Sequence, residues 1–71
     1  MKKEKQYIPK ARYECDNGSY MEFGLIKNPT YDNRIYKKVR SEHEGEWSEH
    51  YDEMRIDEAL NTIQGLAEAL K

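Results

Sequence analysis

The sequence contains few cysteine, proline and glycine residues. It holds one cysteine, two prolines and four glycines among 71 residues. A single cysteine, Cys15, closes no disulfide within the chain, whereas small secreted domains usually carry several. Its longest apolar stretches are dipeptides such as Leu25-Ile26, which is too short for a membrane span or the core of a signal peptide. These absences predict a protein of the reducing cytoplasm.

Aliphatic residues are also scarce. Leu, Ile, Val and Phe together supply 11 of the 71 residues, whereas six tyrosines and Trp47 supply larger apolar bodies. A chain of this length buries only about 60% of the surface that its unfolded form exposes. The composition therefore predicts one small domain over residues 7–71 with an aromatic-rich core, which Trp47 should help to fill. Residues 1–6 are polar and are expected to be a flexible N-terminus.

No pattern typical of catalysis or of cofactor binding occurs. The four glycines are scattered and form no phosphate-binding string. Cys15 lies beside a predicted turn, away from both histidines, and is expected to be a small buried thiol. His43 and His50 are seven positions apart, which matches no zinc-ligand spacing. The sequence thus predicts a protein that is not an enzyme and that holds no metal or other cofactor.

The net charge of −2 conceals a strong polarity along the chain. Residues 1–40 hold ten basic against five acidic side chains, a balance of +5, whereas residues 41–71 hold two against nine, a balance of −7. Such an asymmetry indicates either a binding surface or pairing between the two halves across a sheet.

A first β-hairpin is predicted from Tyr7 to Lys27 around Asp16-Asn17-Gly18. A two-residue Asn-Gly loop would pair Arg12 with Phe23, whereas a three-residue loop with Gly18 left-handed pairs Arg12 with Glu22. A slip of one residue exchanges the two faces of a strand, so the apolar pattern decides between the loops. It favours the three-residue loop, which places Ala11, Tyr13, Met21, Phe23 and Leu25 on the inward face.

A second hairpin is predicted from Arg34 to Met54, with its loop at Glu44-Gly45. Ile35 and Val39 alternate with polar residues in its first strand. Pairing Glu42 with Trp47 across the loop fixes three further pairs, which are Arg40 with Glu49, Lys37 with Asp52 and Ile35 with Met54. Opposite charges at two of these pairs add about 0.2–1 kcal/mol each.

The C-terminal segment shows the spacing of an amphipathic helix. Its apolar residues recur at intervals of three and four, with Asp57 and Glu58 at the start, where acids favour a helix. These residues are Ile56, Ala59, Leu60, Ile63, Leu66, Ala67 and Leu70. The predicted fold class is α+β, with a two-layer architecture in which an antiparallel sheet of two β-hairpins packs against this one C-terminal helix.

Two binding functions are compatible with the sequence. In the first, the chain is a small regulatory or inhibitory module, such as a phage or mobile-element accessory protein, that engages a basic or nucleic-acid-binding protein. If this segment were extended, the carboxylates of Glu42, Glu44 and Glu46 would lie about 6.5–7 Å apart on one side. This distance is close to the spacing of phosphates along a nucleic-acid strand. The predicted acidic rim is Glu42, Glu44, Glu46, Glu49, Asp52 and Glu53.

The alternative is a single-stranded DNA- or RNA-binding module. In the predicted registers the solvent face of the sheet gathers basic and tyrosine side chains, which follow phosphates and stack on bases. The residues of this face are Arg12, Tyr20, Arg34, Tyr36, Lys38 and Arg40. A homodimer is compatible with either function, and no membrane partner is expected.

Overall fold

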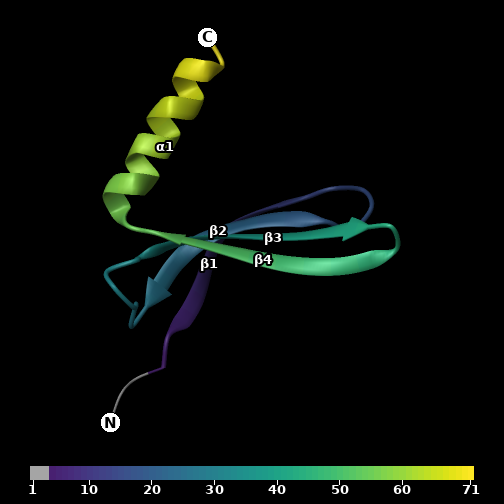
Figure 1. Cartoon of the computed structure of the whole chain (residues 1–71), viewed down its shortest axis with the longest axis horizontal. Helices are drawn as coiled ribbons and strands as arrows, with labels where there is room; N and C mark the ends of the chain where they lie inside the picture. Colours follow the sequence, from purple (N-terminus) through teal and green to yellow (C-terminus); the bar gives the residue numbers. More distant parts are fainter. Residues whose placement is uncertain (1–3) are drawn as a thin grey trace.

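The computed structural model describes residues 4–71 and contains one antiparallel sheet followed by one helix. The strands are β1 (Gln6–Glu14), β2 (Tyr20–Lys27), β3 (Ile35–His43) and β4 (Glu46–Met54), and the helix is α1 (Ile56–Ala69). The strands pair in chain order, β1-β2-β3-β4, so β1 and β4 form the edges (Figure 1). The predicted α+β class with two hairpins and a C-terminal helix is confirmed. Residues 1–3 of the expected flexible N-terminus lie outside the described residues.

The first hairpin has the three-residue loop. Ala11 pairs with Phe23, Arg12 with Glu22 and Tyr13 with Met21, as the apolar pattern predicts. Gly18 adopts a φ of +90°, which is the left-handed conformation that glycine accepts without strain. The Ser19 amide donates a hydrogen bond to Asn17 Oδ1 at 3.0 Å, which closes the turn.

The second hairpin also has the predicted register. Glu42 pairs with Trp47 and Arg40 with Glu49, and the pairing continues to Ile35 with Met54 at the far end. The two residues between the strands, Glu44 and Gly45, have φ values of +53° and +82°. Two successive left-handed residues are typical of a two-residue hairpin turn that matches the twist of the strands.

The buried core lies on the face of the sheet opposite to the one expected. We call this side the tyrosine face and define it by Tyr7, Tyr20, Tyr36, Trp47 and Tyr51. Tyr20, Ile26 and Tyr36 are the hydrophobic side chains buried there. The opposite side, the aliphatic face, was expected to be the core. Its apolar residues are Ile8, Ala11, Tyr13, Met21, Phe23, Leu25, Ile35, Val39 and Met54, and the polar residues Lys37, His50 and Asp52 lie on the same side.

The aliphatic face is open because α1 does not cover it. Met21, Leu25 and Tyr13 are exposed, and Phe23 is half-buried. The helix extends away from the end of β4 and packs against none of the strands (Figure 1). None of its residues is buried. The two-layer packing expected from the amphipathic pattern is therefore absent within one chain.

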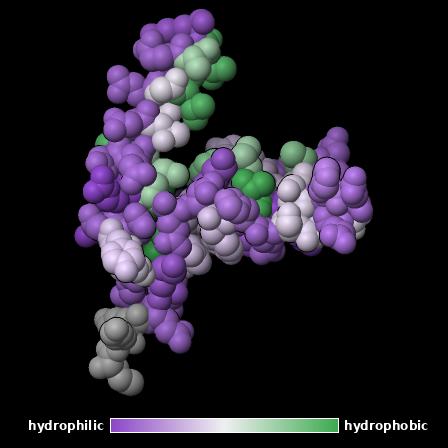
Figure 2. Space-filling model, viewed as in Figure 1, coloured by the Kyte–Doolittle hydropathy of each residue, from purple (hydrophilic) through white to green (hydrophobic). Residues whose placement is uncertain are grey.

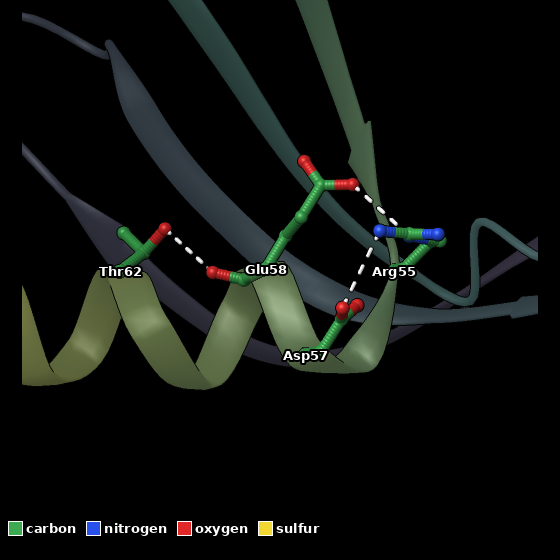
Figure 3. A network of polar contacts seen from close by, with 4 residues as sticks. All are labelled: Arg55, Asp57, Glu58 and Thr62. Carbon is green, nitrogen blue, oxygen red and sulfur yellow. Dashed lines mark hydrogen bonds and ion pairs between the residues drawn. The ribbon is translucent and has the colours of Figure 1, made fainter.

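The helix starts directly after the sheet. Arg55 is the one residue between β4 and α1, with an extended φ of −76° and ψ of 163°. Its guanidinium lies 3.3 Å from Asp57 and 3.5 Å from Glu58, both in the first helical turn (Figure 3).

In the described residues, no helix is long and apolar enough to cross a membrane.

Two side chains expected in the core are exposed. Cys15 follows the end of β1, on the side of the aliphatic face, and is exposed because no second layer covers that side. Trp47 lies on the tyrosine face with 42% of its surface exposed. The expectation for Cys15 assumed a helix over the apolar side of the sheet, whereas that for Trp47 rested on the shortage of aliphatic residues.

Candidate binding face

Three tyrosine rings form the centre of the tyrosine face. Tyr7 on edge strand β1 reaches across the sheet to the rings of Tyr36 and Tyr51, with centroid distances of 4.8 Å and 4.6 Å. Tyr36 is 0% exposed, and its hydroxyl donates a hydrogen bond to Glu22 Oε2 at 2.6 Å. Burial raises the pKa of Tyr36 well above its ordinary value, and this hydrogen bond is the second largest cause of the increase. The cluster thus holds the four strands together with a satisfied hydroxyl at its centre.

Basic side chains alternate with the aromatic rings on this face. The Arg12 guanidinium lies 3.7 Å from the centroid of the Tyr20 ring. The Lys38 ammonium lies 5.4 Å from the Tyr20 ring and 5.5 Å from the Tyr51 ring, within the range of cation–π attraction. These contacts order the cations as well as the rings.

A second cation–aromatic pair lies nearer the hairpin tips. The Arg40 guanidinium lies 4.7 Å from the centroid of the Trp47 ring. A side chain added at Gly18 would approach the Trp47 ring to 3.5 Å. The indole of β4 therefore reaches across the sheet to the β1–β2 turn, and Arg40 lies against it.

Lys38 is a largely enclosed cation of the face, with 16% of its side chain exposed. Its contact with the Tyr20 side chain, followed by those with Tyr51 and Glu49, raises the pKa of Lys38 above its ordinary value. The Lys38 ammonium is 3.6 Å from Glu49. Lys38 therefore stays charged throughout the physiological pH range.

Five of the six residues of the predicted nucleic-acid face lie within strands on one side of the sheet, and Arg34 directly precedes β3 and lies beside the start of α1. Arg12 and Glu22 are opposite each other, and Glu22 is opposite Lys38, so β1, β2 and β3 present these positions on the same side. Tyr20 and Tyr36 are nevertheless buried, Tyr20 beneath the cations of Arg12 and Lys38 and Tyr36 against the rings of Tyr7 and Tyr51. Their rings support the face and offer no open surface to a ligand.

The exposed rings of the face are Trp47 and Tyr51, which the sequence reasoning did not place there. The signal was present, because the predicted pair Glu42–Trp47 puts the indole on the side of Arg40. It was set aside because a domain short of aliphatic residues was expected to bury its tryptophan.

The predicted acidic rim is not one surface. Glu42 lies opposite Trp47 whereas Glu46 lies opposite His43, so these two carboxylates leave the hairpin on opposite faces. Glu44-Gly45 forms the predicted turn, so the extended arrangement of Glu42, Glu44 and Glu46 that the acidic rim would need does not occur. Glu53 lies near the other end of β4. Of the remaining rim residues, Glu49 belongs to the tyrosine face and Asp52 to the opposite one.

The cross-strand ion pairs differ from those expected. Arg40 lies against Trp47, and Glu49 pairs diagonally with Lys38. Arg12 lies over Tyr20 and pairs with Glu14 at 3.0 Å, which leaves Glu22 to accept from Tyr36. Aromatic rings thus compete with carboxylates for the cations, and pairing by strand register alone does not predict the winner.

Glu53 holds the N-terminal edge of the sheet. The Lys5 ammonium lies 2.8 Å from Glu53 Oε2, and the Tyr7 hydroxyl donates to the same oxygen. These two hydrogen bonds, the one from Lys5 first, lower the pKa of Glu53 below its ordinary value of 4.5. Tyr7 lies on β1 and Glu53 on β4, which are the two edge strands, so this contact spans the sheet.

The Glu53 contact predicts a pH-dependent effect of Glu53→Gln. A carboxyl whose pKa is depressed by folding stabilises the fold above its unfolded pKa and loses that contribution as pH falls through the folded pKa. The free energy of unfolding should therefore be larger for wild type than for Glu53→Gln at about pH 7, and this difference should shrink below about pH 4.5. Urea unfolding at several pH values measures it. A difference that is constant with pH would contradict the assigned role.

Metal-type and nucleophilic side chains are dispersed. His50 Nε2 lies 3.1 Å from Asp52 Oδ1, and both side chains are exposed. Within residues 4–71, no three His, Cys, Asp or Glu side chains gather as a metal site would require. Arg34 pairs with Asp32 at 2.7 Å and lines a shallow hollow beside the start of α1.

Comparison of the chain with protein-family models, with curated proteins and with solved structures found no match. The functional argument therefore rests on the geometry of the tyrosine face.

Proposed function

We propose that the protein is a non-enzymatic binding module of the cytoplasm whose tyrosine face takes single-stranded nucleic acid. The observation that supports this most is the gathering of exposed rings and cations on one face. Trp47 and Tyr51 are open to solvent there, beside Arg40 and Lys38. The acidic rim, by contrast, divides between the two faces.

The proposed mode of binding is stacking with electrostatic support. Bases stack on Trp47 and Tyr51, and each base–ring contact contributes about 1–3 kcal/mol irrespective of sequence. Arg12 and Arg40 lie on the tyrosine face, and together with Arg34, which directly precedes β3, they neutralise phosphates. Tyr20 and Tyr36 have a structural role, since they hold the cations and strands in place.

The charge of the face predicts modest affinity and strong salt dependence. Its cations share the surface with Glu14 and Glu49, which pair with Arg12 and Lys38. If three cations meet phosphates, affinity for a single strand falls roughly 20-fold between about 50 and 200 mM salt. A ligand held by hydrophobic contacts alone would show little such dependence.

Trp47→Ala is expected to weaken binding of a fluorescently labelled oligothymidylate by about ten-fold, because one stacked base is lost. The matched control is Tyr31→Ala, which removes a ring that is 89% exposed in the loop between β2 and β3. Fluorescence anisotropy of the labelled strand at about 50 mM salt measures both. Equal affinities of the two variants would exclude Trp47 from the interface, and no binding of wild type would overturn the proposal.

A second candidate function is supported by the β3–β4 tip. Glu42, Glu44 and Glu46 are all exposed around this two-residue turn. A tip of this charge suits a basic protein partner, which electrostatic steering would bring to it, as for a small regulator or inhibitor. This candidate needs no affinity for oligonucleotides, so their failure to bind at low salt would favour it over the first.

A further inference from the structure

The helix α1 presents an unpartnered apolar stripe. Its members are exposed or nearly so, and Ile63 at the centre has 64% of its surface in solvent. The helix has 14 residues, and isolated helices of about 12–15 residues are marginal in water without tertiary packing. A regular helix of this length, carrying a stripe of Ile, Leu and Ala, therefore needs a surface to lie on.

The chain carries a surface of the right chemistry. The aliphatic face of the sheet is uncovered along β1 and β2, with Leu25 43% exposed. In Figure 2, hydrophobic side chains line one side of the helix and the neighbouring side of the sheet, with open space between them. Two apolar surfaces of one chain thus remain in water.

The overall dimensions indicate how much more surface the single chain exposes than a compact monomer of its size. The accessible surface is 6069 Å², whereas a folded monomer of 8.5 kDa is expected to expose about 4,700 Å². The radius of gyration is 14.1 Å, against about 11 Å for a compact domain of this length. The excess of about 1,400 Å² exceeds the roughly 800 Å² that each partner buries in a stable interface.

The connection to β4 directs the helix away from its own sheet. A single extended residue, Arg55, leaves no loop in which the chain could reverse. The ion pairs of Arg55 with Asp57 and Glu58 hold the first turn of α1 at the end of the strand (Figure 3). The helix is therefore presented outward, where another molecule meets it.

We infer that two copies of this chain form a symmetric dimer in which α1 of each lies on the aliphatic face of the other. Each copy gives one helix and receives one, so the twofold arrangement closes and leaves no stripe in water. The second copy is favoured over a different protein because the chain itself supplies both complementary surfaces. The tyrosine face, on the other side of the sheet, stays free in the dimer.

Size-exclusion chromatography with light scattering tests the dimer. The mass expected for wild type is twice the 8.5 kDa of the chain, and its midpoint of thermal unfolding should rise with protein concentration. A monomeric mass with a concentration-independent midpoint would overturn the inference. That result would mean that α1 folds back on its own sheet or awaits another partner.

Two substitutions assign the interface. Ile63→Asp places a charge in the stripe and should weaken the dimer at least about 100-fold, whereas Asn61→Asp on the opposite side of α1 should leave the mass unchanged. Leu25→Asp should also give monomers, and because Leu25 is exposed in one chain, the sheet should still fold. A dimer that survives Ile63→Asp or Leu25→Asp would contradict the exchange of helices, and circular dichroism confirms that each variant is folded.

Discussion

Tyr36→Ala is expected to remove a large part of the free energy that stabilises the folded sheet. Tyr36 is the largest fully buried side chain in the described residues, and its ring contacts those of Tyr7 and Tyr51. Truncation of a buried aromatic ring costs about 3–5 kcal/mol. A chain of this length is stabilised by about 4–11 kcal/mol in total, so this one ring accounts for a large part of it.

The size of the effect distinguishes the ring from its hydroxyl. Tyr36→Phe keeps the packing and removes the hydrogen bond to Glu22, which should cost only about 1 kcal/mol. Tyr31→Ala, in the loop, should stay within about 0.5 kcal/mol of wild type. Urea unfolding followed by circular dichroism gives all three at one protein concentration. A loss for Tyr36→Ala similar to that for Tyr31→Ala would mean that the core lies elsewhere.

Gly24→Ala is expected to lower the unfolding temperature by about 10 °C or more, because no space exists for a methyl group at this position. A Cβ at Gly24 would lie 2.1 Å from the Ile8 carbonyl oxygen and 2.8 Å from Tyr36 Cε1. The backbone of β1 approaches this closely beside the irregularity between Pro9 and Ala11. A methyl group would force β1 away from β2 and disturb Tyr36 as well.

Gly65→Ala provides the opposite result in the same chain. A Cβ at Gly65 meets no atom within 4 Å, and alanine in a helix interior is favoured over glycine by about 1 kcal/mol. Thermal unfolding should therefore show one glycine replacement that destabilises and one that stabilises. If Gly24→Ala were as stable as Gly65→Ala, the close approach of β1 to Gly24 would be wrong.

Much of the sheet was predictable because strand register is a local property. The Asp16-Asn17-Gly18 sequence and the alternation of apolar residues around it decide the first hairpin. The Glu44-Gly45 turn decides the second hairpin down to the pair Ile35–Met54. Both turns contain a glycine with positive φ, and a tight turn with flanking strands leaves few alternative pairings.

The buried side of the sheet was not predictable in the same way. The pattern of Ala11, Met21, Phe23 and Leu25 correctly marks an apolar face, but a second layer was assumed to come from the same chain. Tyrosine rings are long enough to lie across neighbouring strands, so the rings of Tyr7 and Tyr51 help to bury Tyr36 without a second layer. The sequence pattern does not reveal whether α1 folds back or extends outward.

The sequence predicted which residues share the candidate binding face, but the role that it predicted for some of them was wrong. Arg12, Lys38 and Arg40 do lie on one face, as the alternation requires. Tyr20, expected to stack on bases, is instead enclosed by the cations of Arg12 and Lys38. Burial depends on which rings meet across three strands, and this is decided by rotamers and twist rather than by register.

The proposed dimer and the proposed binding face use opposite sides of the sheet. The dimer would cover the aliphatic face, which holds Leu25, and would leave the tyrosine face, which holds Trp47, open on both copies. Two linked faces would bind a longer strand more tightly than one, because the second contact is intramolecular. Ile63→Asp should thus reduce affinity for long oligonucleotides more than for short ones.

The most direct test of the proposed function is the fluorescence of Trp47, which is the only tryptophan in the chain. Oligothymidylate titrated into wild-type protein at about 50 mM salt should quench this emission to saturation, because a base stacks on the indole. The quenching should reverse when salt is raised. Emission that stays constant over the whole titration would contradict binding at the tyrosine face.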